Sequence, residues 1–271
     1  MSLTVQNVEV YLEDRGAGEP VLFLHGVPDS AEMWGGVIGR LEGQYRCIAP
    51  DLPGLGRSVA PSNFSCSLEH MASFIDGLVG AINPPLPLNL VVTDFGATYG
   101  LAWAVTHPEK VRKLAIVGGI NFFSDYRWHP NARLLRLPLL GELGMATMTR
   151  ASFIKTMAPN APLLDSAHFG KVYDLSMAQR SVRRMILRLY RSINPRDFLN
   201  WEDRLLAFTR KVPTLVLWGD QDPFISPAYA ERFGAARVEH FPENGHWLSI
   251  EASAEVAQRL TAFFPADAPV V

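Results

Sequence analysis

Asp94 is the residue whose position says most about chemistry. Residues 90–96 read Leu-Val-Val-Thr-Asp-Phe-Gly, an apolar strand that runs into a short turn with a carboxylate at its tip, and a helix-like stretch follows. This pattern is typical of a nucleophile elbow, in which a strained turn exposes one side chain and the next backbone N–H groups point at the atom it attacks. A carboxylate suits displacement at a saturated carbon, where it forms an alkyl ester. The alternative is that Asp94 only caps the helix.

Other reactive side chains also follow predicted strands. Strand 20–24 precedes His-Gly-Val-Pro at 25–28, strand 214–218 precedes Gly-Asp-Gln-Asp-Pro at 219–223, and strand 237–241 precedes Glu-Asn-Gly-His-Trp at 243–247. Because the carboxyl ends of parallel strands gather at one edge of a sheet, we expect these groups to meet there. The chain order Asp94, Asp222, His246 matches the order of nucleophile, acid and histidine in enzymes built on such an elbow.

Together these motifs resemble those of the α/β-hydrolase superfamily, in the branch that holds epoxide hydrolases and haloalkane dehalogenases. Segment 25–28 is similar to the His-Gly-x-Pro motif of epoxide hydrolases. The resemblance implies an α/β fold with a mostly parallel central sheet flanked by helices. It also implies that Asp94 is the nucleophile, His246 the base and Asp222 the acid that orients the base. Asp220 is a rival for the acid because it lies close by, but Asp222 matches the family position.

By the same resemblance, the backbone N–H groups of Val27 and Phe95 form the oxyanion hole. Asp94 attacks a saturated carbon, and water then hydrolyses the ester at the Asp94 carbonyl. His246, with an ordinary pKa near 6.5, can take the proton of that water at neutral pH. Asp222 holds the imidazole in one tautomer, and the two N–H groups stabilise the charge that develops on the carbonyl oxygen.

The middle of the chain differs from the rest because strand signals give way to helical periodicity. Apolar residues recur at helical spacing at Val182, Met185, Ile186 and Leu189. The family inserts a lid at this place, so we predict a helical cap at residues 121–204 and a hydrolase core at 1–120 and 205–271. The basic residues of the cap could steer an anionic substrate, although a solvated helix face explains them more simply.

Epoxides and haloalkanes need different help for the leaving group. Haloalkane dehalogenases hold the halide with a Trp directly after the nucleophile, whereas Phe95 has no side-chain N–H. An epoxide leaves an alkoxide that a phenol can protonate, and the family places cap tyrosines over the nucleophile for this purpose. Tyr190 resembles one of these tyrosines, and Tyr173 and Tyr126 are candidates for the second by residue type only. The sequence therefore predicts an epoxide hydrolase that gives vicinal diols, with a haloalkane dehalogenase as runner-up and a non-catalytic small-molecule receptor as a further alternative.

Composition sets broader limits. The 271 residues fit one α/β domain with an insertion, and the net charge of −2 gives no electrostatic reason to expect a nucleic acid or an anionic membrane as partner. No signal-peptide or membrane-spanning pattern is evident, which predicts a cytoplasmic protein. The motifs imply no cofactor and no metal site. The expected partner is a small apolar or aryl epoxide, and the oligomeric state is open.

Overall fold

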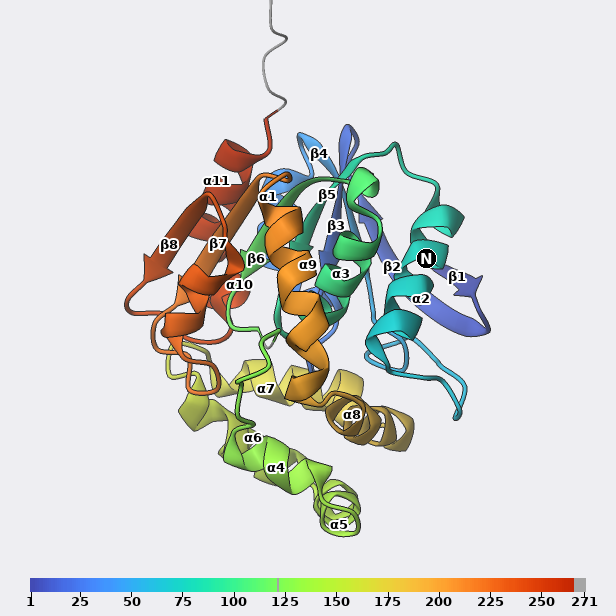
Figure 1. Ribbon diagram of the computed structural model, residues 1–271. Helices are drawn as coiled ribbons and strands as arrows, with labels where there is room; N and C mark the ends of the chain where they lie inside the picture. Colours follow the sequence, from blue (N-terminus) through green and yellow to red (C-terminus); the bar gives the residue numbers. More distant parts are fainter. Residues whose placement is uncertain (121, 266–271) are drawn as a thin grey trace, which may run out of the picture.

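The computed structural model describes residues 1–120 and 122–265 (Figure 1). Asn121, the predicted first residue of the cap, lies outside the described residues. The described residues form an eight-stranded sheet in the order β1-β2-β4-β3-β5-β6-β7-β8. Its strands are β1 (Ser2–Val5), β2 (Val8–Arg15), β3 (Glu19–Leu24), β4 (Tyr45–Pro50), β5 (Leu88–Val92), β6 (Val111–Val117), β7 (Thr214–Gly219) and β8 (Arg237–Phe241). The pairs β1–β2 and β2–β4 are antiparallel and the others are parallel, which confirms the predicted mostly parallel sheet.

Two hydrophobic cores lie on opposite faces of this sheet. In β3, Leu22 and Leu24 belong to one core and Val21 and Phe23 to the other, because successive side chains of a strand point to opposite faces. The first face is covered by α2 (Leu68–Ile82), α3 (Asp94–Thr106) and α9 (Leu199–Thr209), and the second by α1 (Gly35–Leu41), α10 (Leu248–Glu251) and α11 (Ser253–Phe263) (Figure 1). Burial on both faces explains why the central strands are continuous apolar runs.

Between β6 and β7 the chain forms helices, most of which lie beyond one edge of the sheet (Figure 1). They are α4 (Pro130–Arg136), α5 (Leu140–Thr147), α6 (Arg150–Met157), η3 (Ala158–Asn160), α7 (Ser166–Val172), η4 (Tyr173–Met177), α8 (Arg180–Ser192), η5 (Pro195–Phe198) and α9. The periodic apolar residues between 182 and 189 lie in α8 and are buried, as their spacing predicts. The predicted boundary between residues 204 and 205 falls within α9, which packs against α3.

Shorter helical segments connect the remaining elements: η1 (Ala31–Trp34), η2 (Pro108–Lys110) and η6 (Pro227–Phe233). Across the described ranges, each helix is too short or too polar to pass through a lipid bilayer.

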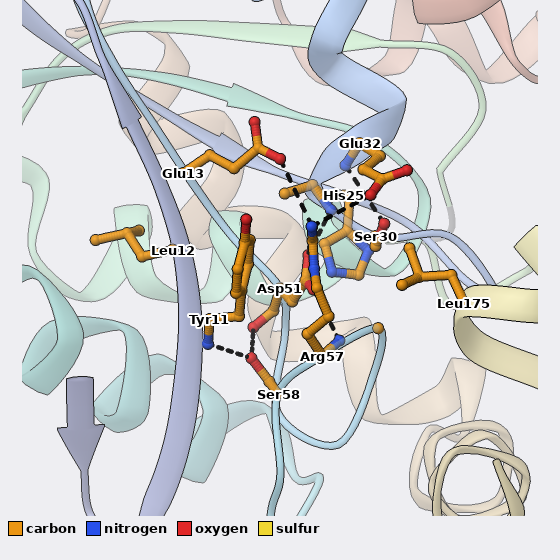
Figure 2. A network of polar contacts seen from close by, with 12 residues as sticks. Tyr11, Leu12, Glu13, His25, Ser30, Glu32, Asp51, Arg57, Ser58 and Leu175 are labelled. Carbon is orange, nitrogen blue, oxygen red and sulfur yellow. Dashed lines mark hydrogen bonds and ion pairs between the residues drawn. The ribbon is translucent and has the colours of Figure 1, made fainter. Parts of the chain in front are cut away.

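The loop after β3 is fixed by a buried charge network at the end of β4, which Figure 2 shows from close by. The fully buried carboxylate of Asp51 accepts hydrogen bonds from the Ala31 N–H (2.7 Å) and from Arg57 Nε (2.8 Å). The guanidinium of Arg57 also lies near Glu13 (3.6 Å) and Glu32 (3.2 Å). A buried carboxylate is costly unless it is paired in this way, so Asp51 and Arg57 together hold the start of η1 in place.

His25 ties the same loop to β4. Its Nε2 accepts the Leu52 N–H at 2.8 Å, and its Nδ1 donates to the Gly26 carbonyl oxygen at 2.7 Å. Burial lowers the pKa of His25, which agrees with a neutral ring that has one donor and one acceptor nitrogen. This histidine is therefore structural, and it sets the path of the backbone through Val27.

The start of α3 lies against the end of β3 with no room for a side chain between them. A Cβ atom at Gly96 would clash with the carbonyl oxygens of Leu24 and His25. A Cβ atom at Gly26 would lie 2.5 Å from the Cβ of Asp94. Gly96 is therefore needed because it lets two backbones approach closely, and Gly26 is needed because it leaves room for the Asp94 side chain.

We expect Gly96→Ala to destabilise the protein by about 3 kcal/mol, because the new methyl group must displace a strand of the central sheet. Gly80→Ala in α2 is the matched control: a Cβ atom there meets nothing within 4 Å. Since alanine is the better helix former, that change should stabilise by about 0.5 to 1 kcal/mol. Urea unfolding of both variants measures the difference, and equal midpoints would contradict the close packing of α3 on β3.

Candidate active site

Asp94 stands at a sharp turn between β5 and α3. Thr93 is extended, with φ −145° and ψ 153°, whereas Asp94 has φ 44°. A positive φ is uncommon for a residue that carries a side chain, and such strain concentrates at functional sites. The turn holds the carboxylate at the carboxyl end of β5, beside the loop that follows β3.

Two backbone N–H groups bind the Asp94 carboxylate. The Val27 N–H donates to Oδ1 at 2.7 Å, and the Phe95 N–H also donates to the carboxylate. Val27 belongs to the loop fixed by His25, and Phe95 follows Asp94 in the first turn of α3. Burial raises the pKa of Asp94, while the charge of His246 and the two N–H donors oppose that rise. The residues expected to form an oxyanion hole are therefore brought together at the Asp94 carboxylate.

His246 lies between two carboxylates. Its Nδ1 is 2.7 Å from Asp222 Oδ2, and its Nε2 is 3.8 Å from Asp94 Oδ2. The other oxygen of Asp222 accepts the N–H groups of Phe224 (2.8 Å) and Ile225 (3.0 Å). Because Asp222 is held on both oxygens, it fixes the ring of His246 with Nε2 toward Asp94.

Asp220, the rival for the acid, lies elsewhere. Its Oδ1 is 2.5 Å from Nδ1 of His240, a half-exposed histidine on β8. The structure thus brings Asp222 rather than Asp220 to the Asp94–His246 pair.

The charge state of His246 depends on its neighbours. Burial disfavours the imidazolium and lowers the pKa of His246. The carboxylates of Asp222 and Asp94 have a larger opposite effect, and together they raise this pKa to about 9. At neutral pH the free protein therefore holds an imidazolium between two carboxylates. If Asp94 were esterified, its charge would disappear, and the pKa of His246 would fall back toward the range of a base.

A cavity of about 340 Å³ opens over Asp94 and His246. Apolar and aromatic side chains make up most of its wall, and the inserted helices supply most of its roof. This volume suits a small organic molecule whose surface is mainly apolar.

Four aromatic rings meet beside the nucleophile. Tyr190 packs edge-on to Phe95 with ring centroids 5.0 Å apart, and Trp128 stacks on Phe95 at 6.3 Å. Tyr126 packs edge-on to Trp128 at 5.3 Å, and all four side chains line the cavity. Burial and the charge of Asp94 raise the pKa values of Tyr190 and Tyr126, so both phenols keep their protons. The hydroxyl of Tyr190 has no hydrogen-bond partner among the described residues.

Tyr173, the other candidate for a second tyrosine, does not line this cavity, and its hydroxyl has other partners. Its hydroxyl accepts from Arg183 at 2.8 Å and donates to the Met148 carbonyl at 3.3 Å. Tyr126 and Tyr190 are thus the pair that the structure places near Asp94.

Two cavity residues were not singled out from the sequence. Within the described part of the chain, the buried Nε1 of Trp128 has no hydrogen-bond partner. Nδ1 of His129 accepts the Ala132 N–H at 3.4 Å as the cap of α4, which leaves the proton on Nε2. Burial and the nearby His246 lower the pKa of His129 to about 4, so this ring is neutral at neutral pH. The only signal in the sequence was a cluster of ring side chains at 126–129, soon after the end of β6.

Comparisons with known proteins bear on the family of this chain. A family model described as "alpha/beta hydrolase fold" matches residues 19–253. A cis-3-alkyl-4-alkyloxetan-2-one decarboxylase of Shewanella oneidensis is 26% identical, over 92% of this chain and 83% of its own length. A haloalkane dehalogenase of Mesorhizobium japonicum is 27% identical, over 94% of this chain and 87% of its own.

Among solved structures, the Cif epoxide hydrolase from Acinetobacter nosocomialis matches with a TM-score of 0.85. The match covers 98% of this chain and 88% of that chain at 19% identity, so it bears on the fold alone. Since the family model spans most of the sequence, this chain belongs to the α/β-hydrolase fold family.

Proposed function

We propose that this protein is an epoxide hydrolase that acts through an alkyl ester on Asp94 and releases vicinal diols. The observation that carries the proposal is the position of Asp94, which two N–H groups hold and His246 faces, under the unpartnered hydroxyl of Tyr190. A buried nucleophile, an aligned base and a proton donor in one apolar cavity are the parts that this reaction needs.

In the first step, Oδ2 of Asp94 attacks an epoxide carbon. A new carbon–oxygen bond forms, one bond of the epoxide ring breaks, and its electron pair stays on the ring oxygen as an alkoxide. Tyr190 or Tyr126 donates a proton to that oxygen, and solvent restores it. Oδ2 is the attacking atom because Oδ1 is held by the Val27 N–H.

In the second step, water attacks Cγ of Asp94 and Nε2 of His246 takes its proton. The charge that develops on Oδ1 meets the N–H groups of Val27 and Phe95, and each such donor is worth roughly 3 kcal/mol in the transition state. The bond between Cγ and the ester oxygen then breaks, and the leaving oxygen takes the proton from His246. One oxygen of Asp94 leaves with the diol, and the attacking water replaces it.

A haloalkane dehalogenase is the second candidate, and Trp128 is the observation that favours it. Its buried, unpartnered indole N–H lines the cavity and could hold a departing halide. The name of the Mesorhizobium relative agrees with this reaction. Phe95 directly after the nucleophile offers no second side-chain donor, so the tyrosine pair makes the epoxide the better substrate. In both reactions Asp94 carries the same ester.

We expect His246→Gln to trap the ester, because it removes the base of the second step and leaves the first intact. Intact-mass measurement after incubation with styrene oxide should show an adduct equal to the whole epoxide. An alkyl adduct without halide, formed only from 1-bromobutane, would favour the dehalogenase instead. Asp94→Asn in the same background should abolish either adduct.

His240→Gln, at the half-exposed histidine paired with Asp220, is the matched control. This variant should turn over substrate without accumulating the ester. If neither probe leaves an adduct, the covalent mechanism is wrong and a receptor becomes the better description.

Tyr190→Phe should separate the two candidate reactions. Loss of the phenol should slow ester formation from styrene oxide by roughly 10²-fold, since it removes a general acid. The same variant should form the ester from a bromoalkane at close to the wild-type rate, whereas Trp128→Phe should slow only that second reaction. Rapid-quench measurements of ester formation test both variants, and the reverse pattern would assign the protein to the dehalogenases.

Hydrolysis of the ester should rise with pH, because the second step needs a neutral His246. The pKa of this residue is about 9 in the free protein. Loss of the Asp94 charge in the ester lowers that value, so the rate should level off at a pH below 9. Ester formation does not need a neutral imidazole and should stay flat between about pH 6 and 8. Single-turnover kinetics with styrene oxide measure the two steps separately. A pH-independent rate of ester decay would exclude His246 as the base.

A further inference from the structure

A second cavity, of about 240 Å³, lies beside the first at the contact between the inserted helices and the core. We call it the side cavity. Its polar lining comes from Asp29, Ser30, Glu32, His168, Lys171, Ser176, Ser249 and Ser253. The residues from α7 and η4 face those from η1 and α10 across it.

Three polar atoms in this lining are buried and have no hydrogen-bond partner among the described residues. They are Oγ of Ser176, Oγ of Ser249 and Nε2 of His168. Ser176 is 0% exposed and Ser249 2% exposed. His168 Nε2 lies 3.7 Å from Asp29 Oδ1, which is too far for a direct hydrogen bond. Leaving such groups unpaired costs about 1 to 3 kcal/mol each, so the side cavity is built to hold a partner with hydrogen-bonding atoms.

Water is the partner that fits this lining best. The charged side chains are of both signs, with Asp29 and Glu32 against Lys171, so the site does not select an ion of one sign. Hydroxyls and an imidazole bind water as donors or acceptors, and the volume has room for several molecules. The side chains of Glu32 and Lys171 are exposed, so the side cavity reaches the surface of the protein.

A hydrogen bond links the lining of the side cavity to the lining of the catalytic cavity. Oδ2 of Asp29 accepts the indole N–H of Trp247 at 3.0 Å. Trp247 also lines the catalytic cavity, and its ring packs edge-on to His246 with centroids 5.1 Å apart. The charge of Asp29 contributes to the raised pKa of His246. Water held at Asp29 is thus one side chain away from the base.

The proposed reaction needs a supply of water at His246. The wall of the catalytic cavity is mainly apolar, and an apolar substrate that fills it excludes water. Hydrolysis of the Asp94 ester nevertheless consumes one water molecule in each turnover. We propose that the side cavity stores this water and delivers it to His246 along Asp29 and Trp247, by a route separate from that of the substrate. The inference rests on the proposed function, because it concerns the second step of that reaction.

The test removes the groups that hold the water. Ser176→Val combined with Ser249→Val replaces both unpartnered hydroxyls with methyl groups and narrows the side cavity. Ester formed from styrene oxide, or from 1-bromobutane if only that reacts, should decay on the order of tenfold more slowly in this variant, with its formation unchanged. Thr261→Val on α11 removes a hydroxyl that lines neither cavity, so it is the matched control and should match the wild type. Ser176→Ala with Ser249→Ala repeats the test with less added volume if the valine pair folds poorly.

A crystal structure provides a readout that does not depend on turnover. Ordered water bonded to Ser176, Ser249 and His168 in the wild type, and lost in the variant, supports the proposal. A dry side cavity overturns it, as does an ordered organic molecule or salt ion in the place of water. Wild-type ester decay in a variant whose side cavity is dry also overturns it, while the proposed function stands. No ester in any protein, including His246→Gln, overturns the proposed function and this inference together.

Discussion

The hydrogen bond from the Val27 N–H to Oδ1 of Asp94, 2.7 Å long, is the contact on which the rest of the site depends. It joins the loop after β3 to the turn after β5. This hydrogen bond could not form if Gly26 and Gly96 carried side chains, because the two segments could not approach closely enough. The Asp51 network fixes the other end of the β3 loop from β4. Three neighbouring strands, in the order β4-β3-β5, must therefore end in register before one N–H meets one oxygen. The strain at Asp94 is maintained by all of them.

The largely buried group of Asp94, His246 and Asp222 also has to balance its charges. In the free protein an imidazolium lies between two carboxylates, and the three groups carry one net negative charge. In the proposed ester state Asp94 is neutral, His246 can lose its proton, and Asp222 alone keeps the negative charge. The net charge is the same in both states, so the reaction does not require a new charge to be buried. The backbone N–H groups on Asp222 serve both states equally.

Much of this could be predicted from the sequence, and the omissions have physical reasons. Strands such as Thr214–Gly219 were predictable because burial on both faces demands apolar runs, and the order of Asp94, Asp222 and His246 follows from the topology. Trp128 could not be predicted because it lies in irregular backbone, where no periodicity tells which side chains turn inward. The side cavity could not be predicted from the sequence for another reason. A serine such as Ser176 shows in the sequence neither its burial nor its lack of a partner, because both depend on contacts between distant segments.

The two cores on opposite faces of the sheet divide the molecule into regions with different tolerance for change. The core between the sheet and α1, α10 and α11 contains none of the proposed catalytic residues. In β3, Phe23 packs into that core, while its neighbour Leu24 packs into the core that continues beneath the catalytic cavity. Along these strands, odd-numbered and even-numbered residues therefore face different cores. Substitutions facing the core of α1, α10 and α11 alter only the stability of the protein. Substitutions facing the other core also alter the shape of the catalytic cavity. Thermal adaptation and substrate divergence can therefore proceed in this fold on opposite sides of the same strands.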